Sequence, residues 1–125
     1  MNNDIDKLIA RSQECLNEAQ QLIEFDFHMG AINRAYYCMF DAARALLYEK
    51  EIFVKTHKGV HTKFNEVYIK TALFERNYSD LMRDVFELRL ACDYDFDAGI
   101  GKDDAAFAIN AATQFLNATK EFLSH

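Results

Sequence analysis

Residues 33–47 read NRAYYCMFDAARALL, and this stretch decides the fold of the chain. Its apolar side chains recur at helical spacing and fill one side of a helix: Met29, Ile32, Tyr36, Met39, Phe40, Ala43 and Leu47. Another side carries Arg34, Tyr37 and Asp41 as an i, i+3, i+7 row. A stripe that served packing alone would not carry a guanidinium, a phenol and a carboxylate, so the row predicts a polar site beside the core. The alternative is an internal ion pair, in which Tyr37 or a residue from elsewhere bridges Arg34 and Asp41.

This stretch belongs to a helix that we place at Gly30–Lys50, and the same periodicity predicts four more. They are expected at Asp4–Phe25, His57–Ile69, Tyr78–Cys92 and Asp104–Leu123, with a buried Leu73-Phe74 pair in the connector at 70–77. We expect Gly30 to reverse the chain and Thr56 and Asp103 to cap helices. Sheets need turn residues often, but the chain has no Pro and only four Gly. The prediction is an all-α, antiparallel up-and-down bundle of about five helices that forms one domain over residues 1–125.

Composition narrows the classes of function. The net charge of −6 counts against broad, sequence-independent nucleic-acid binding, although a local basic pocket remains open. No apolar run reaches the length of a membrane span, and the N-terminus lacks the basic and apolar regions of a signal peptide, so we expect a cytoplasmic protein with no membrane partner. The three widely spaced cysteines are typical of reduced, half-buried thiols, and no cofactor is expected.

The last predicted helix is apolar on more than one side. Phe107, Ala111 and Phe122 lie outside its main stripe, and its many alanines allow another helix to approach closely. A five-helix bundle of this size does not easily bury all of these side chains, so we expect a homodimer. The alternative is a well-wrapped monomer.

Two further polar segments accompany the row. In the segment Lys55-Thr56-His57-Lys58-Gly59, charged and hydroxyl groups converge on a helix N-terminus, which favours a phosphate or carboxylate. The other, residues 87–95, reads ELRLACDYD. The alternatives are that Thr56 is only a cap, and that Arg34 and Arg89 form structural ion pairs with Asp41, Asp93 or Asp95.

A metal site is the weakest interpretation of the polar residues. His57 and His61 stand at i, i+4, a spacing that can hold a metal ion. They have no obvious third ligand, and the flanking lysines would repel a cation. We therefore expect no metal.

Four ordered blocks resemble those of a known family. They are NRAYYCMF (33–40), KTHKGV (55–60), KTALF (70–74) and LRLACDYD (88–95), and they look like successive blocks of the HEPN domain, named for higher eukaryotes and prokaryotes nucleotide-binding. The match is to the stand-alone prokaryotic branch, which is often encoded beside a minimal nucleotidyltransferase. The resemblance implies a dimerising up-and-down bundle with a cleft at the dimer seam. It also implies that relatives include metal-independent endoribonucleases, some of them toxins that the nucleotidyltransferase restrains.

The family signature of those ribonucleases is an Arg followed four to six residues later by a His. Arg89 matches the Arg, but Asp93 and Tyr94 stand where the His is expected. Metal-free RNA cleavage needs a group that exchanges a proton near neutral pH, which His does without a large pKa shift. The resemblance therefore names Arg89, Asp93 and Tyr94 as the catalytic candidates, with His57 as a conjectural replacement imidazole.

The leading hypothesis is a nucleotide- or RNA-binding module that partners a minimal nucleotidyltransferase in a toxin–antitoxin-like pair. Arginines would hold phosphate and a tyrosine would stack on a base. An exposed tyrosine such as Tyr94 would be the natural acceptor if the partner transfers a nucleotide. The alternatives are a metal-independent endoribonuclease toxin and a structural adaptor without a ligand. The candidate ligand-binding residues are Arg34, Tyr37, Asp41, Lys55, Thr56, His57 and Lys58.

Overall fold

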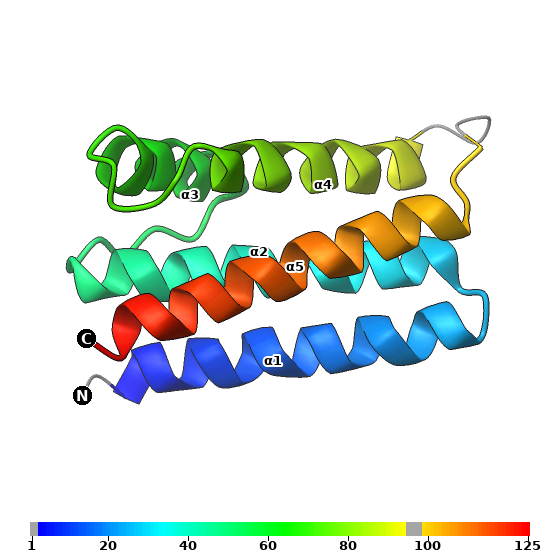
Figure 1. Cartoon of the computed structure of the whole chain (residues 1–125), viewed down its shortest axis with the longest axis horizontal. Coiled ribbons are helices and arrows are strands. Elements are labelled where there is room, and N and C mark those ends of the chain that lie inside the picture. The colour runs from blue at the N-terminus through cyan, green and yellow to red at the C-terminus, as the bar shows by residue number, and fades with distance from the viewer. Residues whose placement is uncertain (1–2, 95–98) are drawn as a thin grey trace.

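The computed structural model describes residues 3–94 and 99–125, and every regular element in this part of the chain is helical. Its elements are α1 (Asn3–Glu24), α2 (His28–Glu49), α3 (His57–Phe64), the π-helical turn η1 (Asn65–Ile69), α4 (Asn77–Tyr94) and α5 (Lys102–Leu123), as Figure 1 shows. The all-α antiparallel bundle is therefore confirmed.

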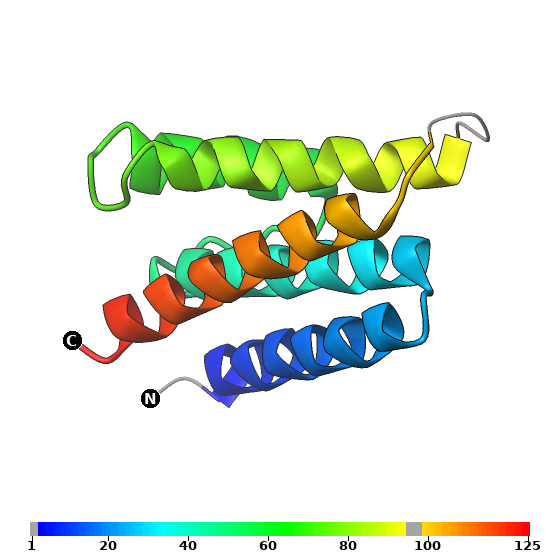
Figure 2. The same ribbon diagram turned by 45° about the vertical axis from the view of Figure 1, so that its right-hand side comes forward.

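Helix α2 is the centre of the bundle and packs against α1, α3, α4 and α5. Figures 1 and 2 show α1 on one side of α2 and α5, and α3 and α4 on the other side. Helices α1 and α2 run antiparallel through a three-residue turn, as the short loop predicts. Because α2 is enclosed on several sides, fourteen of its residues are buried, including Asp41.

Aromatic rings and alanines divide the core between them. Phe64, Tyr68, Phe74 and Phe115 pack together, with the Phe64 and Phe115 ring centres 5.3 Å apart. The Tyr68 hydroxyl donates a hydrogen bond to the Leu46 carbonyl oxygen, which satisfies the polar end of a buried ring. Small residues let α5 approach its neighbours closely, and four are buried inside the monomer: Ala105, Ala108, Ala111 and Ala112.

Three predictions about helix ends and faces are wrong. The chain reverses at Asp26, whose φ of 63° lies in the left-handed region, and Gly30 sits inside the first turn of α2. Met29 is exposed, whereas the apolar stripe predicts that it is buried. The last helix begins at Lys102 because its cap is Gly101, whose N–H donates to Asp104 Oδ2 at 3.0 Å; Asp103 is already helical.

The third helix and the connector agree better with the sequence. Thr56 caps α3 by accepting the Gly59 N–H at 3.0 Å, and the helical segment ends at Ile69, although its last five residues form a π-turn. Of the Leu73-Phe74 pair, Phe74 is buried and Leu73 is exposed. Across residues 3–94 and 99–125, no helix combines the length and apolarity that a membrane span requires.

Candidate functional site

Five side chains from three helices meet on the face of α2 that carries α3 and α4. Tyr36 and Tyr37 come from α2, His57 and His61 from α3, and Arg89 from α4. We call these residues the aromatic–basic cluster. The Tyr36 ring is completely buried, and it contacts both imidazoles with ring centres 5.5 and 6.0 Å away. The cluster therefore has one buried phenol at its centre.

The Tyr36 hydroxyl joins the two imidazoles. Its oxygen lies 2.8 Å from His57 Nδ1 and 3.0 Å from His61 Nε2, both within hydrogen-bond distance. Phe86 of α4 packs against the same rings, 5.3 Å from Tyr36 and 4.9 Å from His61 between ring centres. The phenol is satisfied in an otherwise apolar place, and each imidazole has one nitrogen committed to it.

Arg89 stacks its guanidinium on the two tyrosines. Its Cζ lies 5.3 Å from the Tyr36 ring centre and 5.4 Å from that of Tyr37, within the range of cation–π attraction. Asp93 Oδ2, one turn along α4, is 3.7 Å from Arg89 Nη2. The Arg89 Nε is buried and has no hydrogen-bond partner among the residues described. Aromatic contacts therefore hold this cation in place while part of its donor capacity remains unused.

A second guanidinium approaches Tyr37. Arg34 Cζ lies 5.2 Å from the Tyr37 ring centre, and its Nη2 donates to Asn33 Oδ1 at 2.8 Å. Glu18 Oε1 of α1 is 3.7 Å from Arg34 Nη1. Arg34 and Arg89 therefore meet at one aromatic ring although they are far apart in sequence.

Burial keeps the cluster's imidazoles uncharged at neutral pH. It lowers the pKa of His57, and the nearby Arg89 cation lowers it further. Burial, with a smaller contribution from His57, lowers the pKa of His61 to about 4. Burial also raises the pKa of the Tyr36 hydroxyl, so this group stays protonated. At pH 7 the positive charge of the cluster comes from its arginine.

Asp41 does not join the cluster. It is buried, and its nearest partners are Arg11 Nε of α1 at 3.8 Å and Arg44 Nη1 at 3.7 Å. Burial raises the pKa of its carboxyl group, which the arginines only partly offset. Asp41 is therefore an ion-pair residue, but its partners are Arg11 and Arg44 and not Arg34, which the ion-pair alternative named.

The other predicted site residues form no hydrogen bond, ion pair or ring contact with the cluster among the described residues. Thr56 serves as the cap of α3, while Lys55 and Lys58 are exposed and form no ion pair within residues 3–94 and 99–125. Tyr94, the last residue of α4, is 81% exposed. Asp95, the third acid considered for an ion pair, lies outside the described residues.

Comparison with known proteins identifies the family. The family model for the HEPN domain matches residues 5–122. The chain belongs to the HEPN domain family. A protein of Methanocaldococcus jannaschii named "Putative toxin MJ0142" is 32% identical over 120 residues, which cover 96% of this chain and 82% of the relative.

Solved structures share the fold of this HEPN domain. TT1696 from Thermus thermophilus has a TM-score of 0.83 at 13% identity and covers 97% of this chain and 99% of its own. A structure titled a toxin–antitoxin with AMP-PNP has a TM-score of 0.63 at 17% identity and covers 95% and 99%. At these identities the likeness concerns the fold alone.

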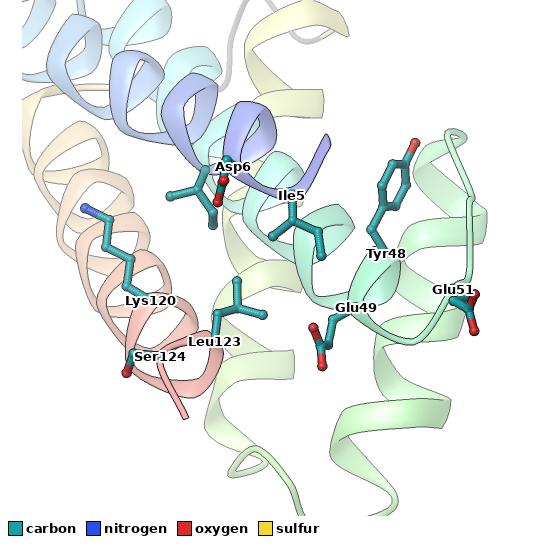
Figure 3. Close-up of a pocket in the computed structure, with 9 residues that line it drawn as sticks. Ile5, Asp6, Tyr48, Glu49, Glu51, Lys120, Leu123 and Ser124 are labelled. Carbon is teal, nitrogen blue, oxygen red and sulfur yellow. The ribbon is translucent and has the colours of Figure 1, made fainter. Parts of the chain in front are cut away.

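A separate pocket of this HEPN domain, of about 410 Å³, lies where the ends of α1, α2 and α5 meet (Figure 3). Its floor is apolar, with Ile5, Tyr48 and Leu123. Its rim carries three carboxylates against one lysine, Lys120. That charge balance disfavours a phosphate, so the aromatic–basic cluster is the better candidate site of the two.

Sequence reasoning misses two members of the cluster. It assigns Tyr36 to the core, which is right for the ring, and it considers His61 only as a metal ligand. One nitrogen of each ring faces the Tyr36 hydroxyl. Within the described part of this HEPN domain, no three His, Cys, Asp or Glu side chains gather closely enough to hold a metal ion. The signal that could find both residues is the i, i+4 histidine pair together with an adjacent pair of tyrosines on another helix.

Proposed function

We propose that this HEPN domain binds a phosphate-bearing ligand, RNA or nucleotide, at the aromatic–basic cluster with Arg34 at its edge. The observation that carries the proposal is the convergence of two guanidinium groups on the Tyr37 ring. Two cations held beside an aromatic face are what a nucleotide needs, because its phosphate is anionic and its base stacks on a ring. The exposed Lys55 and Lys58 add positive charge on the segment that enters α3.

The contact between Arg89 and Asp93 is a long ion pair. Their closest atoms are 3.7 Å apart, longer than the ~2.7–2.9 Å of a charge-assisted hydrogen bond. A phosphate that reaches the exposed part of the Arg89 guanidinium competes with Asp93 for its donors. This local concentration of charge explains how a chain with a net charge of −6 takes an anionic ligand.

Binding can be measured by fluorescence anisotropy with a 5′-labelled uridine octamer and, separately, with ATP. Loss of a hydrogen-bonded charge contact costs about 1.5–3 kcal/mol, or about 10- to 150-fold in affinity, so we expect that decrease for Arg89→Ala. Arg83→Ala is the matched control, because Arg83 lies on the same helix but is exposed and paired with Asp80 and Asp84. It should stay within about twofold of wild type.

The conservative variant Arg89→Lys separates bidentate recognition from simple charge. Lysine keeps the charge but lacks the planar fork, so we expect partial loss of affinity. Wild-type affinity in Arg89→Ala, with an unchanged helical circular dichroism spectrum, would refute the proposal. Absence of binding to both probes would favour the adaptor interpretation.

We also propose that this domain is one half of a toxin–antitoxin-like pair whose other half is a minimal nucleotidyltransferase. A relative of this chain is named a putative toxin, and a toxin–antitoxin structure has the same fold. Tyr94, 81% exposed at the end of α4, is the acceptor we assign if the partner transfers a nucleotide. Co-expression with the product of the neighbouring gene, followed by intact-mass measurement of wild type and Tyr94→Phe, tests both the partnership and the acceptor.

A metal-independent endoribonuclease is the second candidate. The observation that favours it is an imidazole, His57, kept neutral beside the Arg89 cation, since a neutral imidazole can accept a proton. Asp93 and Tyr94 remain the other candidates. Cleavage of RNA that survives EDTA and disappears in Arg89→Ala would establish this activity. Intact RNA in the presence of saturating protein would exclude it.

We propose further that the domain is a homodimer, and the structure supplies a different surface for it than the alanines of the last helix. The alanines of α5 are used inside the monomer, but Phe25, Phe27 and Met29 are exposed together around the α1–α2 turn, and Phe107 is exposed on α5. Exposed apolar side chains in such a group mark interaction surfaces. Light scattering after size exclusion should give twice the chain mass, and Phe27→Ser should lower it; a monomeric wild type would refute the assignment.

A further inference from the structure

We propose that binding of an anion at the aromatic–basic cluster is coupled to uptake of one proton by His57, and that Tyr36 and His61 are the residues that make this uptake possible. The inference rests on the proposed function, which supplies the anion, and goes beyond it by assigning the proton and its acceptor. It follows from counting hydrogens around the Tyr36 hydroxyl.

The Tyr36 hydroxyl has one hydrogen and two nitrogen neighbours. It cannot donate to both His57 Nδ1 and His61 Nε2, although both lie within 3.0 Å of its oxygen. With both rings neutral, one ring must therefore accept the phenolic hydrogen while the other donates its own N–H to the phenolic oxygen. Two arrangements satisfy this condition, and in each the tautomer of one ring fixes that of the other.

Only one of these arrangements accommodates a cationic His57. An imidazolium carries hydrogens on both nitrogens, so His57 Nδ1–H donates to the Tyr36 oxygen. Tyr36 then donates its hydrogen to His61 Nε2, and His61 stays neutral with its hydrogen on Nδ1. When His57 already carries its hydrogen on Nδ1, the only new bond is Nε2–H of His57; from the other arrangement, His61 must first move its hydrogen from Nε2 to Nδ1.

The same count limits the uptake to one proton. If His61 were also an imidazolium, both cationic rings would point an N–H group at the Tyr36 oxygen. Neither ring nitrogen could then accept the hydrogen of the Tyr36 hydroxyl. Like charges at this separation repel strongly in a partly buried site. The triad of Tyr36, His57 and His61 therefore accepts a single positive charge, placed next to Arg89.

His57 is the ring that receives the proton because burial opposes the charged form of His61 more strongly, while the second nitrogen of His57 is free to meet a ligand. His57 Nε2 forms no hydrogen bond with the described residues and is not a buried atom. His61 is held more strongly in its neutral form by burial. Protonated Nε2 of His57 gives the site a new donor for the bound anion, beside the donors of Arg89.

The charges around His57 explain why the proton arrives with the ligand. Arg89 faces it from α4, while the groups from α2 are the uncharged Tyr36 and Tyr37, and those on its own segment are His61 and the flanking Lys55 and Lys58. The carboxylate of Asp93, on the same helix as Arg89, is paired with that arginine. Burial first, and the Arg89 cation second, lower the pKa of His57 in the free protein, and a bound anion offsets the contribution of that cation.

Isothermal titration calorimetry of the full chain with a uridine octamer tests the proposal. Neither phosphodiesters nor uracil titrate over the range from weakly acidic to weakly basic pH, so a dependence of the binding heat on buffer ionisation enthalpy reports protons taken up by the protein. We expect an uptake that approaches one proton per site near the ordinary histidine pKa of about 6.5 and an affinity that rises up to about tenfold per unit fall in pH. His57→Asn should bind with no uptake, and Tyr36→Phe should bind with reduced uptake.

His28→Asn is the matched control, because His28 lies at the start of α2 beside Asp26 and outside the cluster. It should keep the full uptake. The chemical shift of His57 Hε1, followed by NMR with and without the octamer, reads the same proton without relying on any variant. Binding with zero uptake, or uptake that survives in His57→Asn, would overturn this inference and leave the proposed function standing; absence of binding would overturn both.

Discussion

The contact between Thr56 and Gly59 predicts that the effect of Gly59→Ala on the free energy of unfolding changes sign when Thr56 is replaced by alanine. Gly59 is the third residue of α3, where its N–H donates to the Thr56 hydroxyl that caps the helix. A Cβ added at Gly59 would stand 2.7 Å from Thr56 Oγ1 but 3.7 Å or more from Val54. Alanine at this position therefore clashes with the cap and with little else.

Two terms of similar size oppose each other in Gly59→Ala. The smaller conformational freedom of alanine in the unfolded chain stabilises a helix by ~0.4–1 kcal/mol. The clash rotates the Thr56 hydroxyl away and costs the cap, ~1 kcal/mol within a range of ~0.5–2. We expect the single variant to be neutral or destabilised by less than about 1 kcal/mol.

Removing the hydroxyl first removes the second term. Thr56→Ala alone should lose ~1 kcal/mol, and Gly59→Ala made in that background should then stabilise the protein by ~0.4–1 kcal/mol. The coupling free energy between the two sites is thus expected to be ~1 kcal/mol. Thr56→Ser keeps the capping oxygen and serves as the control, in which Gly59→Ala should again fail to stabilise.

Urea unfolding followed by far-ultraviolet circular dichroism measures wild type and every variant of the cycle. The reasoning would be refuted if Gly59→Ala changed the free energy of unfolding equally in the wild-type background and in the Thr56→Ala background. The cycle also concerns the candidate site, because His57 is the first residue of the helix that this cap begins. Loss of the cap should weaken octamer binding in proportion to the fraying of that turn.

Three further predictions concern protons and thiols. Folding lowers the pKa of His61 from 6.5 to about 4, so between these pH values the unfolded chain binds a proton that the native protein does not. The free energy of unfolding should therefore fall by about 1–2 kcal/mol, discounted for partial exposure, as the pH drops from 6.5 to 4. Urea unfolding of His61→Gln should lack this decrease. Burial raises the pKa of Asp41, so above pH 3.8 the native state binds more protons than the unfolded state. The free energy of unfolding of the wild type should therefore fall, relative to that of Asp41→Asn, as the pH rises from 3.8. Parallel plots of this free energy against pH for the two proteins would contradict the prediction. Cys92 should react with a thiol reagent before Cys15 and Cys38, because those two are buried and burial raises the pKa of Cys38 to about 12; equal rates in the native protein would count against the packing described.

The fold follows from the sequence because five long apolar periodicities leave few other arrangements. The errors lie where one residue decides a helix end. Glycine preference predicts a reversal at Gly30, but Asp26 adopts the left-handed conformation and leaves Gly30 free for close packing, 3.4 Å from Leu22 Cδ1 to its ideal Cβ position. Capping preference predicts Asp103 as the cap of α5, but Asp104 bonds back to Gly101. Both are competitions between residues two to four positions apart, which periodicity does not resolve.

The candidate site is predictable only in part, because a sequence pattern places a residue on a face and not the far end of its side chain. Tyr36 lies on the apolar face and its ring is buried, as predicted, yet its hydroxyl passes through that face to α3. The histidine pair is visible in the sequence without its partner, which lies 21 and 25 residues earlier in the chain. Arg34 and Arg89 are both candidates from the sequence, but that they meet at the Tyr37 ring is visible only in the structure.

The row of Arg34, Tyr37 and Asp41 shows why one face of a helix serves two purposes. Residues seven apart share a face but are separated by ~10.5 Å along the axis, so they meet different neighbours. Because α1 runs antiparallel to α2, Arg34 lies near Glu18 while Asp41 lies near Arg11. At the Asp41 end the carboxylate is buried between α1 and α2 and forms structural ion pairs with arginines. At the Arg34 end Tyr37 contacts Arg89 of α4, and there the row brings two cations together at one ring, where we propose that the ligand binds.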